Sequence, residues 1–170
     1  DRGRQSRADR RGSGAVTHPA WTIRAANVYD VPQLRDWACA MALETEHKVL
    51  DPRTVDQGIR AVIDRPRRGA YFVAERGGQA VGTLMLTYEW SDWRNGDWWW
   101  IQSVYVAPEH RRQGVYAALY AHVLAGAKAD HAVCGLRLYV ERDNATAQRT
   151  YESLGMVDAG YRMYEAPTPG

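Results

Sequence analysis

The sequence predicts an α/β fold built on a mixed sheet, with elements in the order β-α-α-β-β-β-α-β-α-β. Three observations lead to this prediction. Apolar residues recur at helical spacing in some segments and alternate with polar residues in others. A Gly-Gly pair at 77–78 separates two strand-like segments, which is typical of a β-hairpin. Hydrophobic residues make up 45% of the 170 residues, which is enough to fill the core of one domain.

Three elements are expected before residue 66. Residues 21–26 alternate like a strand. A helix then opens with Asp30 as its N-cap and Pro32 in its first turn, and apolar residues follow at helical spacing. A second, shorter helix is predicted to begin near Thr54 and to end at residue 64, because a Pro-Arg-Arg-Gly segment follows it.

The middle of the chain is expected to form three antiparallel strands. Residues 70–76 and 79–90 make the Gly-Gly hairpin, a polar and turn-rich loop follows at 91–97, and residues 98–106 make the third strand.

The C-terminal part is expected to alternate helices and strands. A helix at 115–128 precedes a strand at 134–141. A short helix at 144–155 follows, with Asn144 as its N-cap and Gly155 just past its end. Residues 156–166 are predicted to close the sheet as a final strand.

The domain is expected to span residues 21–166, with a short tail at 167–170. Residues 1–20 are rich in Arg, Gly and Ser and almost lack large apolar side chains. They are predicted to be a flexible tail or a cloning remnant.

Composition excludes several classes of function. The net charge is +2, without the basic excess of nucleic-acid-binding proteins. No apolar run approaches the roughly 18 residues of a membrane span, and no secretory pattern is found. A cytoplasmic protein without nucleic-acid or membrane partners is therefore expected. Cys39 and Cys134 lie far apart without metal-ligand spacing, which indicates reduced thiols and no bound metal.

The segment VYVAPEHRRQGVYAALY at 104–120 places basic residues and a glycine between a strand and a helix. A helix that begins at Val115 has N–H groups without partners and the positive end of its dipole there. Gly114 allows the backbone to approach a ligand closely, and Arg111 and Arg112 add full positive charges. The pattern indicates a phosphate site, although a solvated basic turn explains the same residues equally well.

This segment resembles the acetyl-CoA-binding motif of the GNAT superfamily of N-acetyltransferases, Arg/Gln-x-x-Gly-x-Gly/Ala. Arg111 and Gly114 match it, whereas Tyr116 stands where the family has Gly or Ala. The segment NATAQRTYESLGM at 144–156 is similar to the family's Asn-x-x-Ala-x-x-x-Tyr-x-x-x-Gly-Phe segment. The order of the elements also agrees over about residues 21–166. The resemblance implies a GNAT-like fold with a central splayed sheet.

The resemblance also implies a reaction, the transfer of an acetyl group from acetyl-CoA to an amine by direct attack within a ternary complex. We expect the acceptor to be a small molecule. The pyrophosphate would lie on the loop, and the pantetheine arm would pair with the strand that precedes it. The residues expected to bind acetyl-CoA are Val104, Tyr105, Val106, Arg111, Arg112, Gln113, Gly114, Val115, Tyr116, Ala117, Asn144 and Tyr151.

Tyr151 is the expected proton donor to the leaving thiolate. Asn144 and Tyr151 are seven residues apart, so they share one helix face. A core aromatic residue is the alternative, because Ala147 and Leu154 lie on the same stripe. Many family members place a carboxylate on the central strand where this chain has Gln102, and an amide cannot accept the proton. By alternation, Gln102 is expected to share its face with Trp98, Trp100 and Val104.

A general base must then come from elsewhere. Glu89 ranks first because it lies at a strand end. Deprotonation through water, without a single base, is also compatible with the sequence. The other candidates are Asp92, Asp97, Glu44, Glu46 and His47.

Five tryptophans lie between residues 90 and 100. Trp98 and Trp100 are expected on one face of the strand and Trp99 on the other. Trp90 and Trp93, interleaved with carboxylates, resemble the wall of a pocket for a cationic or apolar amine. The residues expected to bind the acceptor are Trp90, Trp93, Trp100 and Glu46.

Two other functions are compatible with the sequence. The chain could be a non-catalytic acyl-CoA-binding module or sensor, as Gln102 and Tyr116 suggest, or a peptide or protein N-acetyltransferase. A monomer or a homodimer is expected. Edge strands and the C-terminal YRMYEA segment offer a seam for a dimer.

Overall fold

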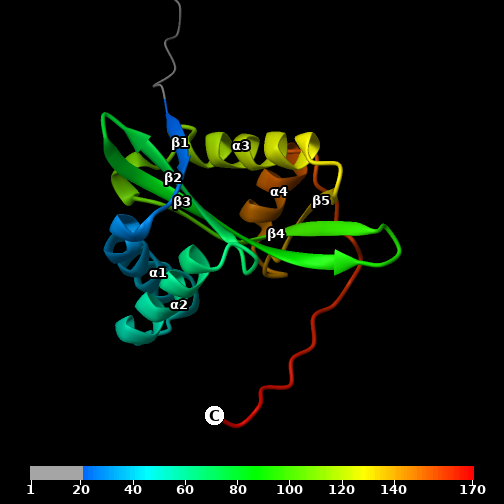
Figure 1. Ribbon diagram of the computed structural model, residues 1–170, viewed down its shortest axis with the longest axis horizontal. Coiled ribbons are helices and arrows are strands. Elements are labelled where there is room, and N and C mark those ends of the chain that lie inside the picture. The colour runs from blue at the N-terminus through cyan, green and yellow to red at the C-terminus, as the bar shows by residue number, and fades with distance from the viewer. Residues whose placement is uncertain (1–20) are drawn as a thin grey trace, which may run out of the picture.

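The computed structural model describes residues 21–170, and these form one five-stranded sheet with helices on both faces (Figure 1). The strands lie in chain order across the sheet. Neighbours are antiparallel from β1 to β4, and β4 pairs with β5 in parallel. The elements are β1 (Thr22–Ala25), α1 (Val31–Glu46), α2 (Pro52–Asp64), β2 (Ala70–Arg76), β3 (Gln79–Ser91), β4 (Gly96–Val106), α3 (Val115–Ala129), β5 (Val133–Leu138) and α4 (Ala145–Ser153), with short 3-10 helices at Val28–Asp30 and Pro108–His110.

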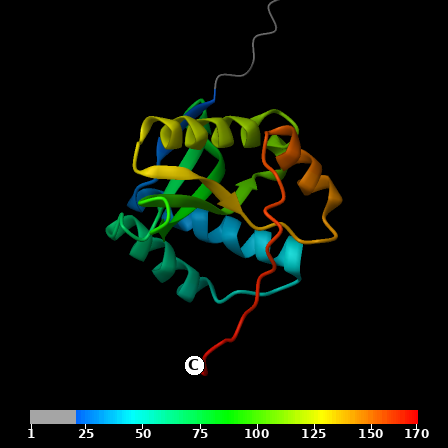
Figure 2. The same ribbon diagram turned by 90° about the vertical axis from the view of Figure 1, so that its right-hand side faces the viewer.

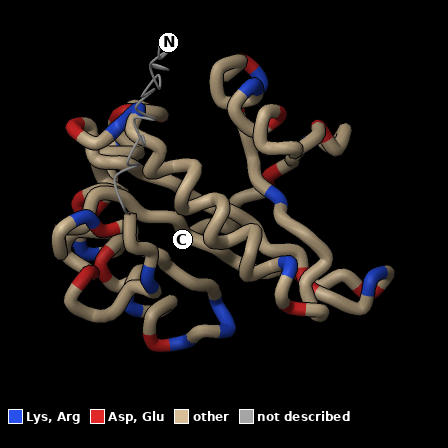
Figure 3. Tube along the Cα trace, turned by 90° about the horizontal axis from the view of Figure 1, so that it is seen from above, with Lys and Arg blue, Asp and Glu red and all other residues tan. Residues whose placement is uncertain are grey.

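The helices bury two separate cores against the sheet. Figure 2 shows α3 on one side of the sheet and α1 with α2 on the other. Leu84, Leu86 and Leu119 centre the core under α3, and Leu34 and Ile59 belong to the core under α1 and α2. Acidic and basic residues are interspersed along the chain rather than gathered on one stripe (Figure 3).

The start of α1 differs from the prediction. Asp30 stands at the N-cap position, but its side chain caps nothing in α1. Its carboxylate instead accepts hydrogen bonds from Arg24 at 2.7 Å and from the Asn27 backbone at 2.8 Å. The capping interaction belongs to the 3-10 helix that precedes α1. Pro32 lies in the first turn, as predicted.

Both hairpins are present, and the second is longer than predicted. Gly77 and Gly78 have φ of 57° and 77°, the left-handed turn that two glycines allow. β3 continues to Ser91 and β4 begins at Gly96, so only a short turn remains of the expected loop at 91–97. Asn95 supplies the positive φ of this turn at 49°.

A β-bulge at Gln102 divides β4. Met85 pairs with Ser103 and Leu86 pairs with Ile101, which leaves Gln102 without a partner on β3. The pairing with β5 ends at Ile101 and Leu138. A bulge bends its strand and increases the twist, so β4 separates from β5 at this point.

The predicted final strand at 156–166 is wrong. Residues 154–170 contain no strand after α4, and this segment runs away from α4 past β5 to the C-terminus (Figures 1 and 2). An Asx turn interrupts it, because the Gly160 N–H donates to Asp158 Oδ1 at 2.8 Å and Gly160 has φ of 75°. The alternating pattern indicated an extended chain, but it did not indicate which strand the chain pairs with.

Cys39 and Cys134 are free thiols. No helix in the described residues is long and apolar enough to cross a membrane. The predicted tail at 1–20 lies outside the described residues.

Candidate functional site

The C-terminal half of β4 has an open backbone edge. The Ala107 N–H donates to the Val81 carbonyl at 2.9 Å, and residues opposite each other in antiparallel strands alternate between bonded and non-bonded pairs. The backbone groups of Tyr105 therefore face β3, and those of Val104 and Val106 face the opposite side. No strand in residues 21–170 pairs with them there, because β5 has already ended.

The start of α3 adds further backbone donors to this edge. Gly114 stands at the N-cap position with φ of 85°, and no side chain caps the helix. The first bond within the helix joins the Ala118 N–H to the Gly114 carbonyl at 3.0 Å. The N–H groups of Val115, Tyr116 and Ala117 are consequently directed out of the helix end, where they favour an anion.

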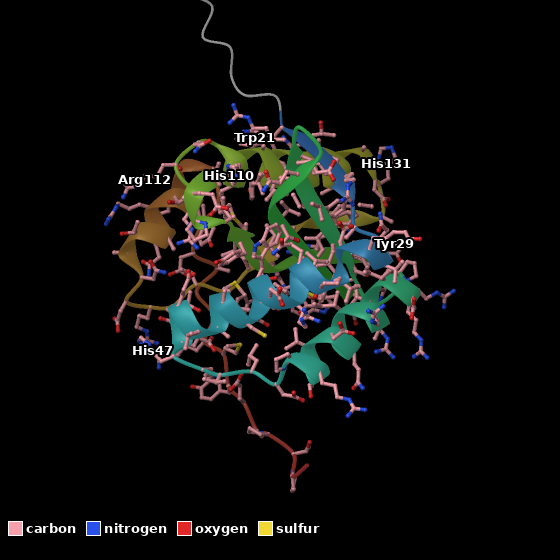
Figure 4. The ribbon with its side chains drawn as sticks, turned by 90° about the vertical axis from the view of Figure 1, so that its left-hand side faces the viewer. Trp21, Tyr29, His47, His110, Arg112 and His131 are labelled. Carbon is pink, nitrogen blue, oxygen red and sulfur yellow. The ribbon has the colours of Figure 1, made fainter. Side chains whose placement is uncertain are left out.

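The two arginines of this loop point in different directions. Arg111 Nε donates to the Val106 carbonyl at 2.9 Å, and its Nη2 donates to Glu44 on α1 at 3.0 Å. Its guanidinium also lies 5.3 Å from the ring centroid of Tyr105. Arg112 has a left-handed backbone, with φ of 60°, and its side chain projects into solvent (Figure 4). Arg112 is therefore the arginine available to a ligand.

Glu44 connects this loop to α1. It accepts a hydrogen bond from Arg111 and one from the Tyr105 hydroxyl at 3.0 Å. These bonds, with Arg111 first, hold the pKa of Glu44 below its usual value. A carboxylate with a lowered pKa and two donors is a weak proton acceptor, so its surroundings suit a structural role.

α4 brings Tyr151 toward the start of α3. Asn144 Oδ1 caps the helix by accepting from the Ala147 N–H at 3.0 Å, as predicted. The ring centroids of Tyr151 and Tyr116 are 6.2 Å apart. The side chain of Tyr116 thus packs toward α4 and the core instead of lying over the backbone donors.

The hydroxyl of Tyr116 is buried without a hydrogen-bond partner in the described part of the chain. Burial raises its pKa, and the neighbouring Tyr151 raises it further. The two tyrosines therefore lie close enough to interact, but their hydroxyls do not meet the geometry of a hydrogen bond.

A second group of side chains lies on the sheet face that α1 and α2 leave open. Arg137 Nη1 donates to Glu89 Oε1 at 2.5 Å, and Trp100 Nε1 donates to Glu89 Oε2 at 3.2 Å. The Arg137 guanidinium lies 4.0 Å from the ring centroid of Trp98, and Tyr139 packs on Trp100 at 4.5 Å. We call Glu89, Trp98, Trp100, Arg137 and Tyr139 the aromatic face.

Gln102 lies beside the aromatic face. Its Nε2 donates to Thr87 Oγ1 at 2.7 Å, and Thr87 pairs with Trp100. The expectation that Val104 shares this face is wrong, because the bulge at Gln102 reverses the alternation. Val104 instead packs against the core under α3.

Several predicted acceptor residues lie apart from the aromatic face. Trp90 follows Tyr88, which packs on Trp99 toward α3, so alternation places Trp90 on the other face of the sheet from Glu89. Trp93 is 91% exposed in the hairpin turn, where the Asp92 carboxylate accepts from its N–H at 2.9 Å. The structure does not bring these two tryptophans together with Trp100 and Glu89.

The end of α1 holds the remaining predicted residues. Glu46 pairs with Lys48 at 3.1 Å, and His47 has a left-handed backbone with φ of 54°. Neither contacts the aromatic face. Two surface hollows of about 460 and 290 Å³ are lined only by α1, α2 and the segment between them, so neither includes a residue of β4, α3 or α4.

Sequence reasoning missed Arg137 and Tyr139. The alternation in residues 134–141 contained their signal, because Leu136 and Leu138 occupy one face of β5 and pack on the core. Arg137 and Tyr139 must then project to the opposite face. Their place beside Trp98 and Trp100 could not be predicted, because it depends on the pairing of β5 with β4.

The model of the acetyltransferase (GNAT) family matches residues 31–156. A possible acetyltransferase from Clostridium difficile 630 has 40% sequence identity and a TM-score of 0.84, covering 88% of this chain and 99% of its own. No curated protein matches the chain.

Two more distant structures share the fold. A ribosomal-protein-alanine N-acetyltransferase from Brucella melitensis biovar Abortus 2308 has 19% identity and a TM-score of 0.68, covering 88% of this chain and 100% of its own. Aminoglycoside N-acetyltransferase AAC(6')-Iy in complex with CoA has 16% identity and a TM-score of 0.69, covering 87% and 95%. At these identities the likeness extends to the fold alone, and the names of the two proteins indicate different acceptors.

Proposed function

Because the chain belongs to the GNAT acetyltransferase family, we propose that it is an N-acetyltransferase that moves an acetyl group from acetyl-CoA to the amine of a small molecule. The observation that carries the proposal is the break between β4 and β5 after Ile101. It leaves the backbone groups of Val104 and the N–H of Val106 without a strand partner next to the start of α3, while the Val106 carbonyl accepts from Arg111.

The residues present fit acetyl-CoA. An extended amide-containing chain can pair with the open edge at Val104 and Val106. A diphosphate fits the N–H groups that begin α3, with Gly114 providing close approach and Arg112 providing charge. Arg111 supports this loop from behind through Glu44 and Val106. When bound, acetyl-CoA supplies an acetyl group activated as a thioester.

Tyr151 is the residue proposed to provide the proton for the thiolate. It lies on α4, the helix that Asn144 caps, and its ring centroid is 6.2 Å from that of Tyr116 in the first turn of α3. A phenol hydroxyl at this place can donate its proton to the leaving sulfur.

The aromatic face is proposed to bind the acceptor. The rings of Trp100 and Tyr139 pack against each other and would line one side of the acceptor site. Glu89 contributes a negative charge beside them. The carboxylate of Glu89 is already occupied by Arg137 and Trp100, so it is better suited to orient an ammonium group than to take its proton. We infer that water, held near Gln102, carries the proton to solvent.

Two experiments test this function. Isothermal titration calorimetry measures the binding of CoA, and the release of free thiol is followed with acetyl-CoA and a panel of small amines. We expect CoA binding and turnover with at least one amine. Tyr151→Phe should lower kcat by about a hundredfold, the usual contribution of acid catalysis, with CoA affinity nearly unchanged.

The alternatives give different results. CoA binding without turnover of any amine or peptide would favour the sensor, and turnover only with peptide N-termini would favour a protein N-acetyltransferase. Absence of CoA binding would contradict the proposed function altogether. If Tyr151→Phe keeps the wild-type kcat, Tyr151 is not the acid.

A further inference from the structure

Positive charge exceeds negative charge on the aromatic face. Two guanidinium groups lie over the Trp98 ring, that of Arg137 at 4.0 Å and that of Arg94 at 5.0 Å from its centroid. Glu89 is the carboxylate beside them, and it already accepts hydrogen bonds from Arg137 and Trp100. Two guanidinium groups against one carboxylate leave an excess of one positive charge. This excess repels a polycation and attracts an anion.

The other carboxylates of the hairpin do not lie on this face. Asp97 precedes Trp98 on β4, so alternation directs its side chain to the opposite face. Asp92 lies in the turn, where its Oδ1 accepts from the Trp93 N–H at 2.9 Å. β5 contains no acidic residue. Glu89 is therefore the carboxylate that strands β3, β4 and β5 direct onto the aromatic face.

Arg137 can bind a ligand without releasing Glu89. Its guanidinium packs on Trp98, and that ring lies against Gly135, where an added Cβ would come within 2.8 Å of it. An arginine has five N–H donors, and here Nη1 donates to Glu89. The side chain of Arg137 is 29% exposed. A carboxylate can thus pair with the remaining N–H groups, the arrangement that guanidinium and carboxylate groups favour.

On the premise of the proposed acetyl transfer, we propose that the acceptor resembles an amino acid: an amine on an apolar body that also carries a carboxylate, which Arg137 binds. Arg94 adds positive charge from the turn, and Trp100 with Tyr139 contacts the apolar body. Arg137 pairs with Trp100 across the sheet, and a rise of about 3.3 Å per residue puts Gln102 about 7 Å further along β4. A molecule of amino-acid size spans this separation, so binding of its carboxylate at Arg137 directs its amine toward the open edge of β4.

Three compounds with the same ring and two-carbon chain separate the two charges. Phenylalanine carries an amine and a carboxylate, phenethylamine carries only the amine, and 3-phenylpropionate carries only the carboxylate. Isothermal titration calorimetry measures the binding of each compound to the full chain without CoA. We expect each of the two carboxylates to bind with a Kd at least about tenfold below that of phenethylamine, because each forms a charge-assisted pair with Arg137. A smaller difference, or a preference for phenethylamine, would overturn the proposal.

Substitution identifies the side chain that binds the carboxylate. Arg137→Gln should raise the Kd of 3-phenylpropionate at least about tenfold. The matched control is Arg67→Gln, at an exposed arginine in the turn before β2, which should leave this Kd unchanged. An equal Kd in wild type and Arg137→Gln would contradict the proposal. Because Arg137 also holds Glu89, Arg94→Gln in the exposed turn provides a second variant, and it should raise the same Kd about threefold.

Turnover separates this inference from the proposed function. With acetyl-CoA, kcat/KM for phenylalanine should exceed that for phenethylamine at least about tenfold. In Arg137→Gln the ratio should fall to about one or below, because Glu89 without its guanidinium partner favours the cation. Acetylation of phenethylamine but not of phenylalanine would overturn the inference while acetyl transfer stands. If neither compound is acetylated, the calorimetric result decides. Absence of CoA binding would contradict the proposed function, whereas the binding of the three compounds is measured without CoA.

Discussion

Arg111 and Arg112 are adjacent in sequence but have different surroundings. Arg111 is held by Glu44 and by the Val106 carbonyl, whereas Arg112 has no ion-pair partner among the described residues. A guanidinium that is already paired adds little charge to a phosphate site. We therefore expect Arg112 to contribute most of the side-chain attraction to CoA, and Arg111 to hold the loop.

Substitution separates the two roles. Arg112→Asn removes the charge, and asparagine tolerates the left-handed backbone there. It should weaken CoA binding about tenfold, less so at high salt, and leave the free energy of unfolding unchanged. Arg111→Met, by contrast, should lower the free energy of unfolding slightly, because the Val106 carbonyl loses its donor and Glu44 loses an exposed ion-pair partner.

Calorimetry and urea unfolding check these changes. Arg65→Asn, at an exposed arginine just after α2, is the matched control and should leave both quantities unchanged. Equal loss of CoA affinity and of stability in the two variants would contradict the division between Arg111 and Arg112.

At the scale of elements, β4 determines the arrangement of the site. The bulge at Gln102 separates β4 from β5 and directs the backbone of Val104 and Val106 to an open edge. α3 begins a few residues later, so its free N–H groups lie on the same path. One strand and one helix start thus supply all the backbone groups of the proposed CoA site.

Hydrogen exchange measured by NMR tests this arrangement. On addition of CoA, amide exchange at Val106, Val115, Tyr116 and Ala117 should slow by at least about tenfold. The reason is that hydrogen-bond acceptors on the bound CoA would protect these N–H groups from exchange. The amide of Tyr105 is an internal control, since β3 already protects it. Protection of Tyr105 and Val106 to the same extent would contradict the proposed pairing with the open edge.

The sequence predicted most elements because their signals are local. Gly77 and Gly78 specify a left-handed turn, and Asn144 caps α4 through its own neighbours. The bulge at Gln102 has no such signal, since one extra residue in a strand leaves the pattern almost unchanged. Strict alternation therefore placed Val104 on the wrong face.

The site was predictable only in part for a similar reason. The loop at 111–117 is a continuous segment, so its role in anion binding could be proposed from its composition. The aromatic face joins residues of β3, β4 and β5 that are far apart in sequence. The hydrogen bonds from Arg24 to Asp30 and from Arg111 to Glu44 likewise form only in the folded structure, so the sequence alone did not predict them.

At the scale of the whole molecule, one ion-pair network joins the N-terminal strand to the rest of the sheet. Arg24 on β1 binds Asp30 before α1 and Glu75 on β2, at 2.7 and 2.8 Å. The hydrogen bond from Arg24 is the main cause that holds the pKa of Asp30 below its usual value. Global stability should therefore depend on the ionisation of Asp30.

The sign of the pH dependence follows from the lowered pKa. Its contribution is fully present above the unfolded pKa of about 4 and is lost as pH falls through the folded pKa. Asp30→Asn should lower the free energy of unfolding by about 2 kcal/mol at pH 7, and the difference from the wild type should shrink below about pH 4. Urea unfolding at several pH values measures both.

The exposed Asp64 at the end of α2 provides the control. Asp64→Asn should change the free energy of unfolding little at any of these pH values. A difference between wild type and Asp30→Asn that stays constant down to pH 2 would show that the carboxylate charge of Asp30 does not stabilise the fold.

The stacking of Arg137 on Trp98, with Trp100 next to it, gives the protein an optical reporter. Indole emission changes in wavelength and intensity with the polarity and charge around the ring. A molecule that binds on these rings would displace solvent and disturb the guanidinium, which lies 4.0 Å from the Trp98 ring centroid and 5.9 Å from that of Trp100. Titration followed by intrinsic fluorescence can thus test whether unlabelled amines bind to the aromatic face as proposed.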